Sequence, residues 1–254
     1  MRIFYIFGIK FFDGSPDEIL ETLKNGGVLV APSGPGLSTI KTHHQYLLSL
    51  QQSTVAIFDS GLLCLLLRLK NMKVQKLSGL KFLIFYLSYL SRNQHHHVLM
   101  VNPSAKDGDN NHQLLINKFN LSPGKILNYT APLYKPEKIE DDQLVSIIKQ
   151  NRPEHIIINI GGGTQEILAN HLINQISKFY RPTIICTGAA IAFLTGSQAK
   201  IPSLIDRLYL GWFARCCKNP RHFIPRYFKS LNLIKLALQE KVQSNVVNIK
   251  DVGI

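Results

Sequence analysis

The chain has 254 residues, 45% of them hydrophobic and 18% charged, which indicates a globular protein with a sizeable core and excludes a disordered chain. Its formal net charge of +13 points to a polyanionic partner, such as nucleic acid, an anionic membrane or phosphorylated small molecules. Four cysteines without a C-x-x-C pair provide no disulfide framework and indicate a reduced, cytoplasmic protein.

The apolar N-terminal run, residues 1–12, lacks the small-residue cleavage site of a signal peptide. Two later apolar stretches lie at residues 55–69 and 77–90. Charged residues interrupt the first, and the second is shorter than the roughly 20 residues that a membrane-spanning helix needs. We therefore expect no transmembrane helix and interpret both stretches as buried core.

Seven short runs rich in Val, Ile and Leu are predicted to be strands: residues 2–9, 26–31, 54–58, 97–102, 125–130, 154–160 and 182–187. Most lack polar alternation, which is typical of parallel strands covered on both faces. Helical patterns lie between them, at residues 16–24, 37–50, 60–70, 79–91, 110–120, 139–150 and 164–179. The alternation predicts an α/β fold, with a doubly wound, mostly parallel sheet, over residues 1–202.

The strand pattern stops near residue 200. Residues 203–254 are predicted to form a basic helical C-terminal appendage, and residues 203–245 read as entirely helical. From Lys200 onward there are ten Lys or Arg residues against three Asp or Glu. Arginines interleaved with aromatic residues suit a pyrophosphate group, a membrane surface or nucleic acid. The plain alternative is a helix face with snorkelling arginines.

Ligands of such folds bind at the carboxyl ends of the strands, so residues that follow strands are the candidate site. Asp59 follows the strand at 54–58 and is either a general base or the cap of the next helix. The glycines at 161–163 open a helix and either hold a phosphate or form a turn without ligand. Lys76 lies just before a helix start and, taken alone, is more simply a solvated cation. The run 95–97, three histidines, is interpreted as a solvated loop rather than a metal site.

The order of motifs resembles the WecB/TagA/CpsF family of inverting glycosyltransferases over roughly residues 3–235. The family's G-x-P-K-Q-E motif corresponds to Gly161–Glu166, its VG-x-x-FD-x-x-AG-x-x-x-RAP block to Thr187–Pro202, and its LEW-x-x-RL-x-x-EP-x-R-x-x-RY signature to Leu210–Tyr227. Looser matches lie upstream. The T-P-N, PDG-x-G and V-x-R-x-x-G elements correspond to Ala31–Ser33, Phe58–Gly61 and Val74–Gly79.

The resemblance implies a role for each matching residue. Asp59 matches the proposed catalytic base, and Gln165 and Glu166 match residues of the sugar-nucleotide pocket. The arginines of the appendage match groups that close over the donor pyrophosphate and stabilise the leaving diphosphate. The remaining substrate-binding positions follow from the other motifs, and the full predicted set is Asp59, Ser33, Lys76, Gly161, Gln165, Glu166, Gly188, Arg215, Arg221 and Arg226.

The chain departs from the family pattern at several motif positions. Ala31 and Ser33 replace a threonine and an asparagine, and Ala192 replaces the aspartate of the F-D pair. Further departures lie at Gly163, Thr164, Lys200, Gly211 and Asn219. These changes indicate a divergent branch with a different donor or acceptor. Because Asp59 and the three arginines are retained, an active enzyme is favoured.

The resemblance therefore predicts an inverting glycosyltransferase that moves a sugar from a UDP-sugar to a polyprenyl-diphosphate-linked acceptor in cell-wall or exopolysaccharide synthesis. The family has no metal-binding D-x-D motif, so neither metal nor cofactor is implied.

The expected partners are the donor, the acceptor and, through the appendage, the inner face of the cell membrane. Nucleic acid is not expected, and self-association is possible. The alternative is a catalytically silent binding protein of the same fold. A Rossmann-like oxidoreductase is disfavoured, because G-x-G-x-x-G is absent after the first strand.

Overall fold

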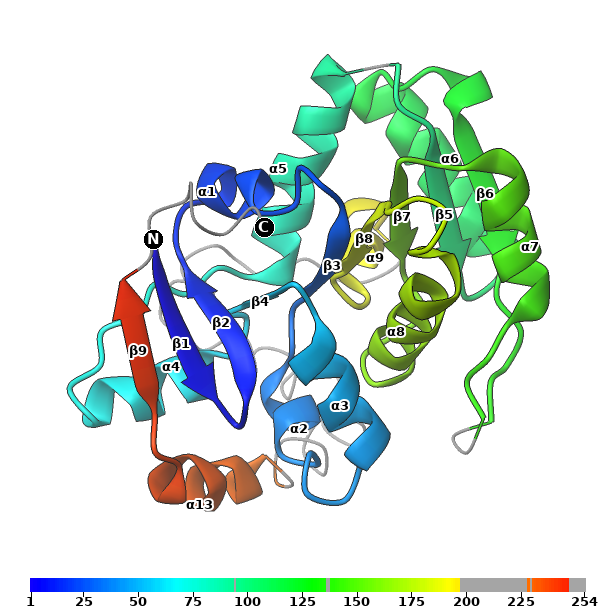
Figure 1. Cartoon of the computed structure of the whole chain (residues 1–254). Helices are drawn as coiled ribbons and strands as arrows, with labels where there is room; N and C mark the ends of the chain where they lie inside the picture. The colour runs from blue at the N-terminus through cyan, green and yellow to red at the C-terminus, as the bar shows by residue number, and fades with distance from the viewer. Residues whose placement is uncertain (94, 136–137, 197–227, 229, 247–254) are drawn as a thin grey trace.

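The computed structural model describes the chain except for residues 94, 136–137, 197–227, 229 and 247–254 (Figure 1). A nine-stranded sheet runs through it in the order β6-β5-β7-β8-β3-β4-β2-β1-β9. The strands are β1 Arg2–Ile6, β2 Ile9–Asp13, β3 Gly27–Val30, β4 Val55–Ile57, β5 Val98–Asn102, β6 Ile126–Thr130, β7 His155–Ile158, β8 Thr183–Cys186 and β9 Gln243–Val246. The strands from β6 to β2 pair in parallel, whereas β1 is antiparallel to both β2 and β9.

Helices cover both faces of the sheet. The α5 face carries α1 Pro16–Glu21, α5 Gly79–Arg92, α6 Ala105–Phe119 and α9 Ala190–Leu194. The α8 face carries α2 Gly34–Leu37, α3 His44–Gln52, α4 Gly61–Leu69, α7 Asp142–Asn151, α8 Thr164–Ile176 and α13 Leu231–Gln239. A short 3-10 helix, η1 Pro123–Lys125, precedes β6. The doubly wound, mostly parallel α/β fold predicted from the sequence is confirmed.

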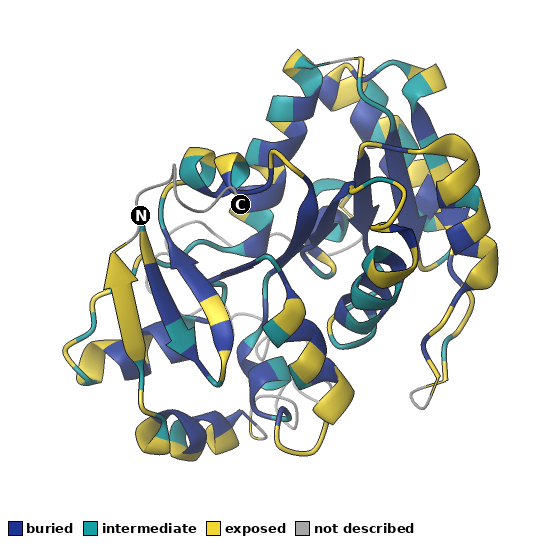
Figure 2. Ribbon diagram, in the orientation of Figure 1, coloured by how far each residue is buried: buried dark blue, intermediate teal, exposed yellow. Residues whose placement is uncertain are grey.

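The central strands are buried on both faces, as the continuous apolar runs predicted. Every residue of β3, β4, β5, β7 and β8 is buried. Figure 2 shows these strands as the dark centre of the molecule, with the exposed strand β9 at one edge. Burial of apolar surface on both faces supplies the main stabilisation of such a sheet.

The first predicted strand, residues 2–9, is instead a hairpin. Phe7 and Gly8 both have positive φ, 56° and 73°, and link β1 to β2 with Ile6 opposite Ile9. A two-residue turn with positive φ at both positions matches the twist of paired strands, so the chain reverses there. Pattern alone missed the reversal because the apolar run continues through the turn.

The helix predicted over residues 37–50 is also divided, into α2 and α3. Between them three hydroxyl groups hydrogen-bond to carbonyl oxygens three residues earlier: Ser38 to Pro35 at 2.7 Å, Thr39 to Gly36 at 2.8 Å and Thr42 to Thr39 at 3.0 Å. Such local side-chain bonds compete with a continuous helix. The start of α6 differs as well, since the helix begins at Ala105 and not at residue 110. Ser104 caps it there, because its Oγ accepts a hydrogen bond of 3.1 Å from the Asp107 N–H.

The C-terminal part of the chain returns to the core. Within α13, Leu233 is fully buried, and the helix packs against α4 and α2. Residues 243–246 then form β9 on the edge of the sheet, so the expectation that residues 203–245 are entirely helical is wrong there. The predicted division at residue 202 lies outside the described residues.

Candidate active site

The carboxyl edge of the sheet, meaning residues 31–34, 58–60, 159–163 and 187–188, is the place where the candidate residues gather. The chain passes from β3, β4 and β7 to helices on the α8 face, whereas it passes from β8 to α9 on the α5 face. Neighbouring strands whose loops leave in opposite directions open a crevice, which is where α/β proteins bind ligands.

Asp59 follows β4 and is held at the start of α5. Its Oδ1 accepts a hydrogen bond of 2.9 Å from the backbone N–H of Gly79, the first residue of this 14-residue helix. A helix N-terminus carries partial positive charge and therefore attracts a carboxylate. Ser60 caps α4 instead, because its Oγ accepts from the Leu63 N–H at 3.2 Å. The alternative that Asp59 caps that helix is wrong, and its role as a base stays a prediction.

Gly79 lets α5 approach the strand ends closely. A Cβ at this position would lie 3.2 Å from Ala31 Cβ, 3.3 Å from Thr187 Cβ and 3.4 Å from the Thr187 carbonyl oxygen. The ends of β3, β4 and β8 therefore meet around one helix N-terminus. A side chain at this position would require Ala31, Thr187 or α5 itself to give way by a few tenths of an ångström.

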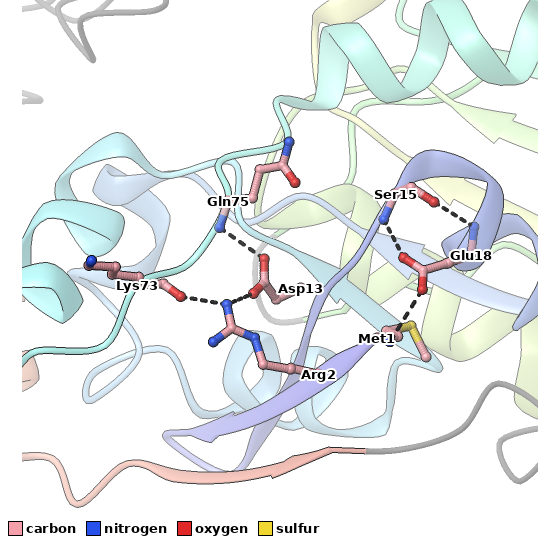
Figure 3. A network of polar contacts seen from close by, with 7 residues as sticks. All are labelled: Met1, Arg2, Asp13, Ser15, Glu18, Lys73 and Gln75. Carbon is pink, nitrogen blue, oxygen red and sulfur yellow. Dashed lines mark hydrogen bonds and ion pairs between the residues drawn. The ribbon is translucent and has the colours of Figure 1, made fainter.

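The segment before α5 is fixed by a polar network that sequence reasoning did not find (Figure 3). The buried carboxylate of Asp13, at the end of β2, accepts from the Gln75 N–H at 2.9 Å and from the Arg2 guanidinium. Arg2 also donates to the Lys73 carbonyl oxygen at 2.6 Å. These bonds tie residues 73–75 to the edge of the sheet and so position the segment that carries Lys76.

Lys76 is half-buried and lies near the end of β4, where Leu77 N–H donates to the Phe58 carbonyl at 3.1 Å. The role of Lys76 in substrate binding stays a prediction. Burial raises the pKa of the neighbouring Cys64 thiol to about 12, with opposing charge effects from Lys76 and Asp59. The thiol therefore stays protonated at neutral pH and is no candidate nucleophile.

The glycine loop, Gly161–Gly163, joins β7 to α8, and the first turn of α8 is bonded to the loop after β8. Gly161 and Gly163 have φ of 102° and 94°, which L side chains rarely adopt. Gln165 Oε1 accepts from the Gly188 N–H at 3.1 Å, and Gln165 Nε2 donates to Glu166 Oε1 at 2.9 Å. Gly163 N–H donates to Glu166 Oε2 at 2.6 Å. The predicted pocket residues thus link two neighbouring loops, and their contact with a donor stays a prediction.

Glu166 is 1% exposed, and this burial raises the pKa of its carboxyl to about 7. Hydrogen bonds from Gln165 and from the Gly163 N–H act in the opposite direction. Desolvation is the larger effect because the charged form loses its water entirely. The group therefore titrates near neutral pH, and its carboxylate occupies one amide of the glycine loop.

Ser33 lies at the start of α2, where its Oγ accepts from the Gly36 N–H at 3.3 Å. A cleft of about 560 Å³ runs from α2 and α3 to the glycine loop, and an adjoining one of about 290 Å³ continues between α3 and α8. The larger cleft is lined on one side by Gly36, Thr39 and Tyr46 and on the other by Gly163 and Thr164. It opens on the α8 face, whereas Asp59 is held on the α5 face.

Three candidates, Arg215, Arg221 and Arg226, lie outside the described residues. The remaining seven, Asp59, Ser33, Lys76, Gly161, Gln165, Glu166 and Gly188, all lie at the carboxyl edge or on the segments directly joined to it.

The resembled family has no metal-binding D-x-D motif, but a D-x-D spacing does occur in this chain, at Asp107-Gly108-Asp109. It lies within α6, where residues two apart do not face each other. Asp107 accepts from the Ser104 hydroxyl at 2.6 Å, and Asp109 is exposed. Among the described residues, no three His, Cys, Asp or Glu side chains are grouped so that they could hold a metal ion.

The histidine run at 95–97 lies at the opposite, amino edge of the sheet and is only partly solvated. The His96 ring packs against His155 at a centroid distance of 4.7 Å, so the interpretation as a solvated loop is wrong for His96. Tyr86 Oη hydrogen-bonds to His155 Nδ1 at 2.6 Å. Burial lowers the pKa of His155 to about 4 and raises that of Tyr86, so the tyrosine is the donor. We call Tyr86, Tyr89, His96 and His155 the amino-edge cluster.

Asn102, Asn159 and Thr187 are further polar residues of the carboxyl edge. Asn102 is fully buried, and Asn159 and Thr187 are 5% and 8% exposed. All three stand at or just after the end of a strand, which is the signal that could have pointed to them. Only Thr187 had appeared in a motif, and it had no role there.

None of the helices in the described ranges is long and apolar enough to cross a membrane. The family model described as the glycosyl transferase WecG/TagA/CpsF family matches residues 4–246, which is nearly the whole chain. None of the curated proteins compared with the sequence matches it significantly.

Proposed function

The chain belongs to the WecG/TagA/CpsF glycosyltransferase family, and we propose that it is an inverting, metal-independent glycosyltransferase with Asp59 as its base. The proposed donor is a UDP-sugar and the proposed acceptor a polyprenyl-diphosphate-linked sugar, in cell-wall or exopolysaccharide synthesis. One observation carries the proposal. The carboxylate of Asp59 is fixed at the carboxyl edge by the Gly79 N–H, and Gly79 in turn lies against Thr187 in the loop that follows β8.

In the proposed reaction Asp59 takes the proton of an acceptor hydroxyl. The acceptor oxygen attacks the anomeric carbon of the donor sugar from the side opposite to UDP, so a glycosidic bond forms as the bond to the diphosphate breaks. This single displacement inverts the configuration at the anomeric carbon. Anchoring through Oδ1 limits the rotation of the carboxylate, which keeps the proton acceptor in one place.

The leaving UDP carries the charge that develops as the bond breaks. One amide of the glycine loop is already occupied by Glu166, so we assign the stabilisation of the diphosphate to Arg215, Arg221 and Arg226. The planar guanidinium group donates two parallel hydrogen bonds to a phosphate, and fixed positive charge at a leaving group lowers the barrier. The proposal includes no metal ion, in keeping with the family resemblance.

We also propose that the protein acts at the inner face of the cell membrane through its basic C-terminal residues. Removal of residues after 200 is a poor test, because α13 packs into the core and β9 pairs with β1 in the sheet. Reversing the charge of Lys218, Lys229 and Lys235 in the full chain avoids this problem. Flotation with anionic vesicles should fall in that variant relative to the wild type, and equal flotation would contradict the membrane assignment.

The reaction itself is tested by release of UDP. The purified protein is incubated with UDP-glucose, UDP-galactose, UDP-N-acetylglucosamine or UDP-N-acetylmannosamine, each with and without a polyprenyl-diphosphate-linked N-acetylglucosamine. Acceptor-dependent release of UDP from one donor is the expected result. Binding of a UDP-sugar, seen as a raised melting temperature, without any release would favour the catalytically silent alternative.

A further inference from the structure

Four polar or small residues form one row across four neighbouring strands at the carboxyl edge. The register pairs Val101 with Ile158, Ile158 with Cys186 and Cys186 with Val30. The next residues along these strands are Asn102, Asn159, Thr187 and Ala31. In each strand the residue before the pair partner packs into the core on the α5 face, so alternation places all four side chains on that face.

Hydrogen bonds fix the orientation of the amides in this row. Asn102 Nδ2 donates to the Met100 carbonyl and to Asn128 Oδ1, both at 3.2 Å, and Asn102 Oδ1 accepts from Asn111 at 2.7 Å. Asn159 Nδ2 donates to Asn102 Oδ1 at 3.5 Å. The same nitrogen also donates to the Ile157 carbonyl oxygen at 3.5 Å, so the oxygen of Asn159 is left as the acceptor.

Two neighbouring oxygens of the row have no hydrogen-bond partner among the described residues, Asn159 Oδ1 and Thr187 Oγ1. Both side chains are more than nine-tenths buried. Buried polar groups of native proteins are normally paired, so two adjacent exceptions call for a ligand or an ordered water. Thr183, at the other end of β8, follows the rule, since its hydroxyl donates to the Leu23 carbonyl oxygen at 3.2 Å.

Asn159 and Thr187 lie between Asp59 and the glycine loop, which are the two parts of the proposed active site. Thr187 Cβ is 3.3 Å from where a Cβ of Gly79 would lie, and Gly79 is the residue that holds Asp59. The next residue, Gly188, is bonded to Gln165 beside the glycine loop. A Cβ at any glycine of that loop would meet no described atom within 4 Å, so space is open there.

We propose that Asn159 and Thr187 form a subsite that binds one hydroxyl group of the transferred sugar. A carboxamide oxygen can only accept a hydrogen bond, whereas a threonine hydroxyl can also donate one. A ligand hydroxyl satisfies both, because it donates to Asn159 and accepts from Thr187. The transferred sugar is the substrate part that lies between the base and the diphosphate. The inference rests on the proposed glycosyltransferase function and adds a specificity-determining pair to it.

The test compares two substitutions at position 187 with a matched control at position 183. Thr187→Val removes the hydroxyl at nearly constant shape, and Thr187→Ser keeps it. Thr183→Val removes the paired hydroxyl at the other end of the same strand. KM for the active UDP-sugar should rise about tenfold in Thr187→Val, which is the usual effect of losing one hydrogen bond. It should stay within twofold in Thr187→Ser and Thr183→Val.

Ala31 allows a rescue experiment. It is half-buried, and its Cβ approaches the same point beside Gly79 as that of Thr187. In the double variant Ala31→Thr/Thr187→Val, a hydroxyl returns from the neighbouring strand, and KM should fall back toward the wild-type value. A donor that lacks the bound hydroxyl should show the same KM with the wild type and with Thr187→Val.

The outcomes separate this inference from the function on which it rests. If the wild type releases UDP and Thr187→Val has the wild-type KM, the subsite is wrong and the glycosyltransferase assignment stands. A lower melting temperature of Thr187→Val with unchanged KM would show that the pair holds an ordered water instead. If no UDP-sugar is bound or turned over by the wild type, both proposals fall together.

Discussion

The two edges of the same sheet differ in how they treat buried polar groups. At the amino edge, Tyr86 and His155 hydrogen-bond to each other, and aromatic rings pack on them from several sides. At the carboxyl edge, the glycines at 161–163 leave open space, and Asn159 and Thr187 keep oxygens that have no partner in the described part of the chain. His155 Nε2 and His96 Nδ1 are also unpaired among the described residues, but rings rather than open space surround them. The polar groups of the amino edge are enclosed by packing, whereas the carboxyl edge is the one at which we propose ligand binding.

The largest expected difference between the edges is in catalysis. Asp59→Asn keeps an oxygen that can accept from the Gly79 N–H, so the fold should be retained, but it removes the base. UDP release should fall by about 10²–10⁴-fold, the usual contribution of a positioned general base. Initial rates at saturating substrates give the comparison, with the melting temperature as the control for folding. Wild-type rates in Asp59→Asn would overturn the assignment of the base.

The pH dependence of stability should have opposite signs at the two edges. Glu166 has a pKa of about 7 in the folded protein against an ordinary 4.5. Its contribution to the free energy of unfolding is therefore full below pH 4.5 and is lost as the pH rises to 7. His155 has a pKa of about 4 against an ordinary 6.5, so its contribution is full above pH 6.5 and is lost as the pH falls to 4. Each shift corresponds to about 3 kcal/mol of unfolding free energy.

Replacing the titrating residue of one edge should reveal the pH dependence of stability that the titrating residue of the other edge causes. In Glu166→Gln, the free energy of unfolding should rise between pH 4.5 and 6.5, because the His155 contribution is no longer opposed. In His155→Gln it should fall over the same range. Urea unfolding at several pH values measures both trends against the wild type, and all other titrating groups are common to the two variants. Parallel trends in the two variants would show that these groups do not govern the pH dependence.

A methyl group at the carboxyl edge should disturb both the fold and the reaction. Gly79→Ala brings a Cβ to within 3.2–3.4 Å of Ala31 and Thr187, so strands or helix must shift. We expect a loss of about 1–3 kcal/mol of unfolding free energy, as for other overpacked sites, together with reduced UDP release. Gly124→Ala is the matched control, because a Cβ there meets no described atom within 4 Å. Equal behaviour of the two variants would contradict the close approach of α5.

The smallest effect is expected at the amino edge. Tyr86→Phe leaves the ring packing in place and removes the hydroxyl that donates to His155 Nδ1. The loss of one buried hydrogen bond should lower the unfolding free energy by about 1 kcal/mol, or the melting temperature by about 2–4 °C. UDP release should not change. A marked loss of UDP release would mean that the two edges are coupled and do not have separate roles.

The sequence predicted the elements whose signal is local. Continuous apolar runs identified β3, β4, β5, β7 and β8, because strands buried on both faces need no polar alternation. The rule that ligands meet the carboxyl ends of strands placed Asp59 and the glycine loop correctly at one edge. The apolar pattern failed at the hairpin between β1 and β2 and within residues 37–50. In both places turn residues divided runs that looked continuous. It also missed β9, whose exposed residues QSNV carry no apolar pattern.

What the sequence alone determined, then, is the α/β class and the family to which the motifs belong, because both depend on residue type and spacing along the chain. The tertiary structure decided which residues are neighbours. Asp59 and Gly79 are 20 residues apart, yet they share a hydrogen bond, and Asn159 and Thr187 become adjacent only through the register of β7 with β8. Contacts across a sheet depend on strand order, and the order β6-β5-β7-β8-β3-β4-β2-β1-β9 brings together strands that are far apart in the chain.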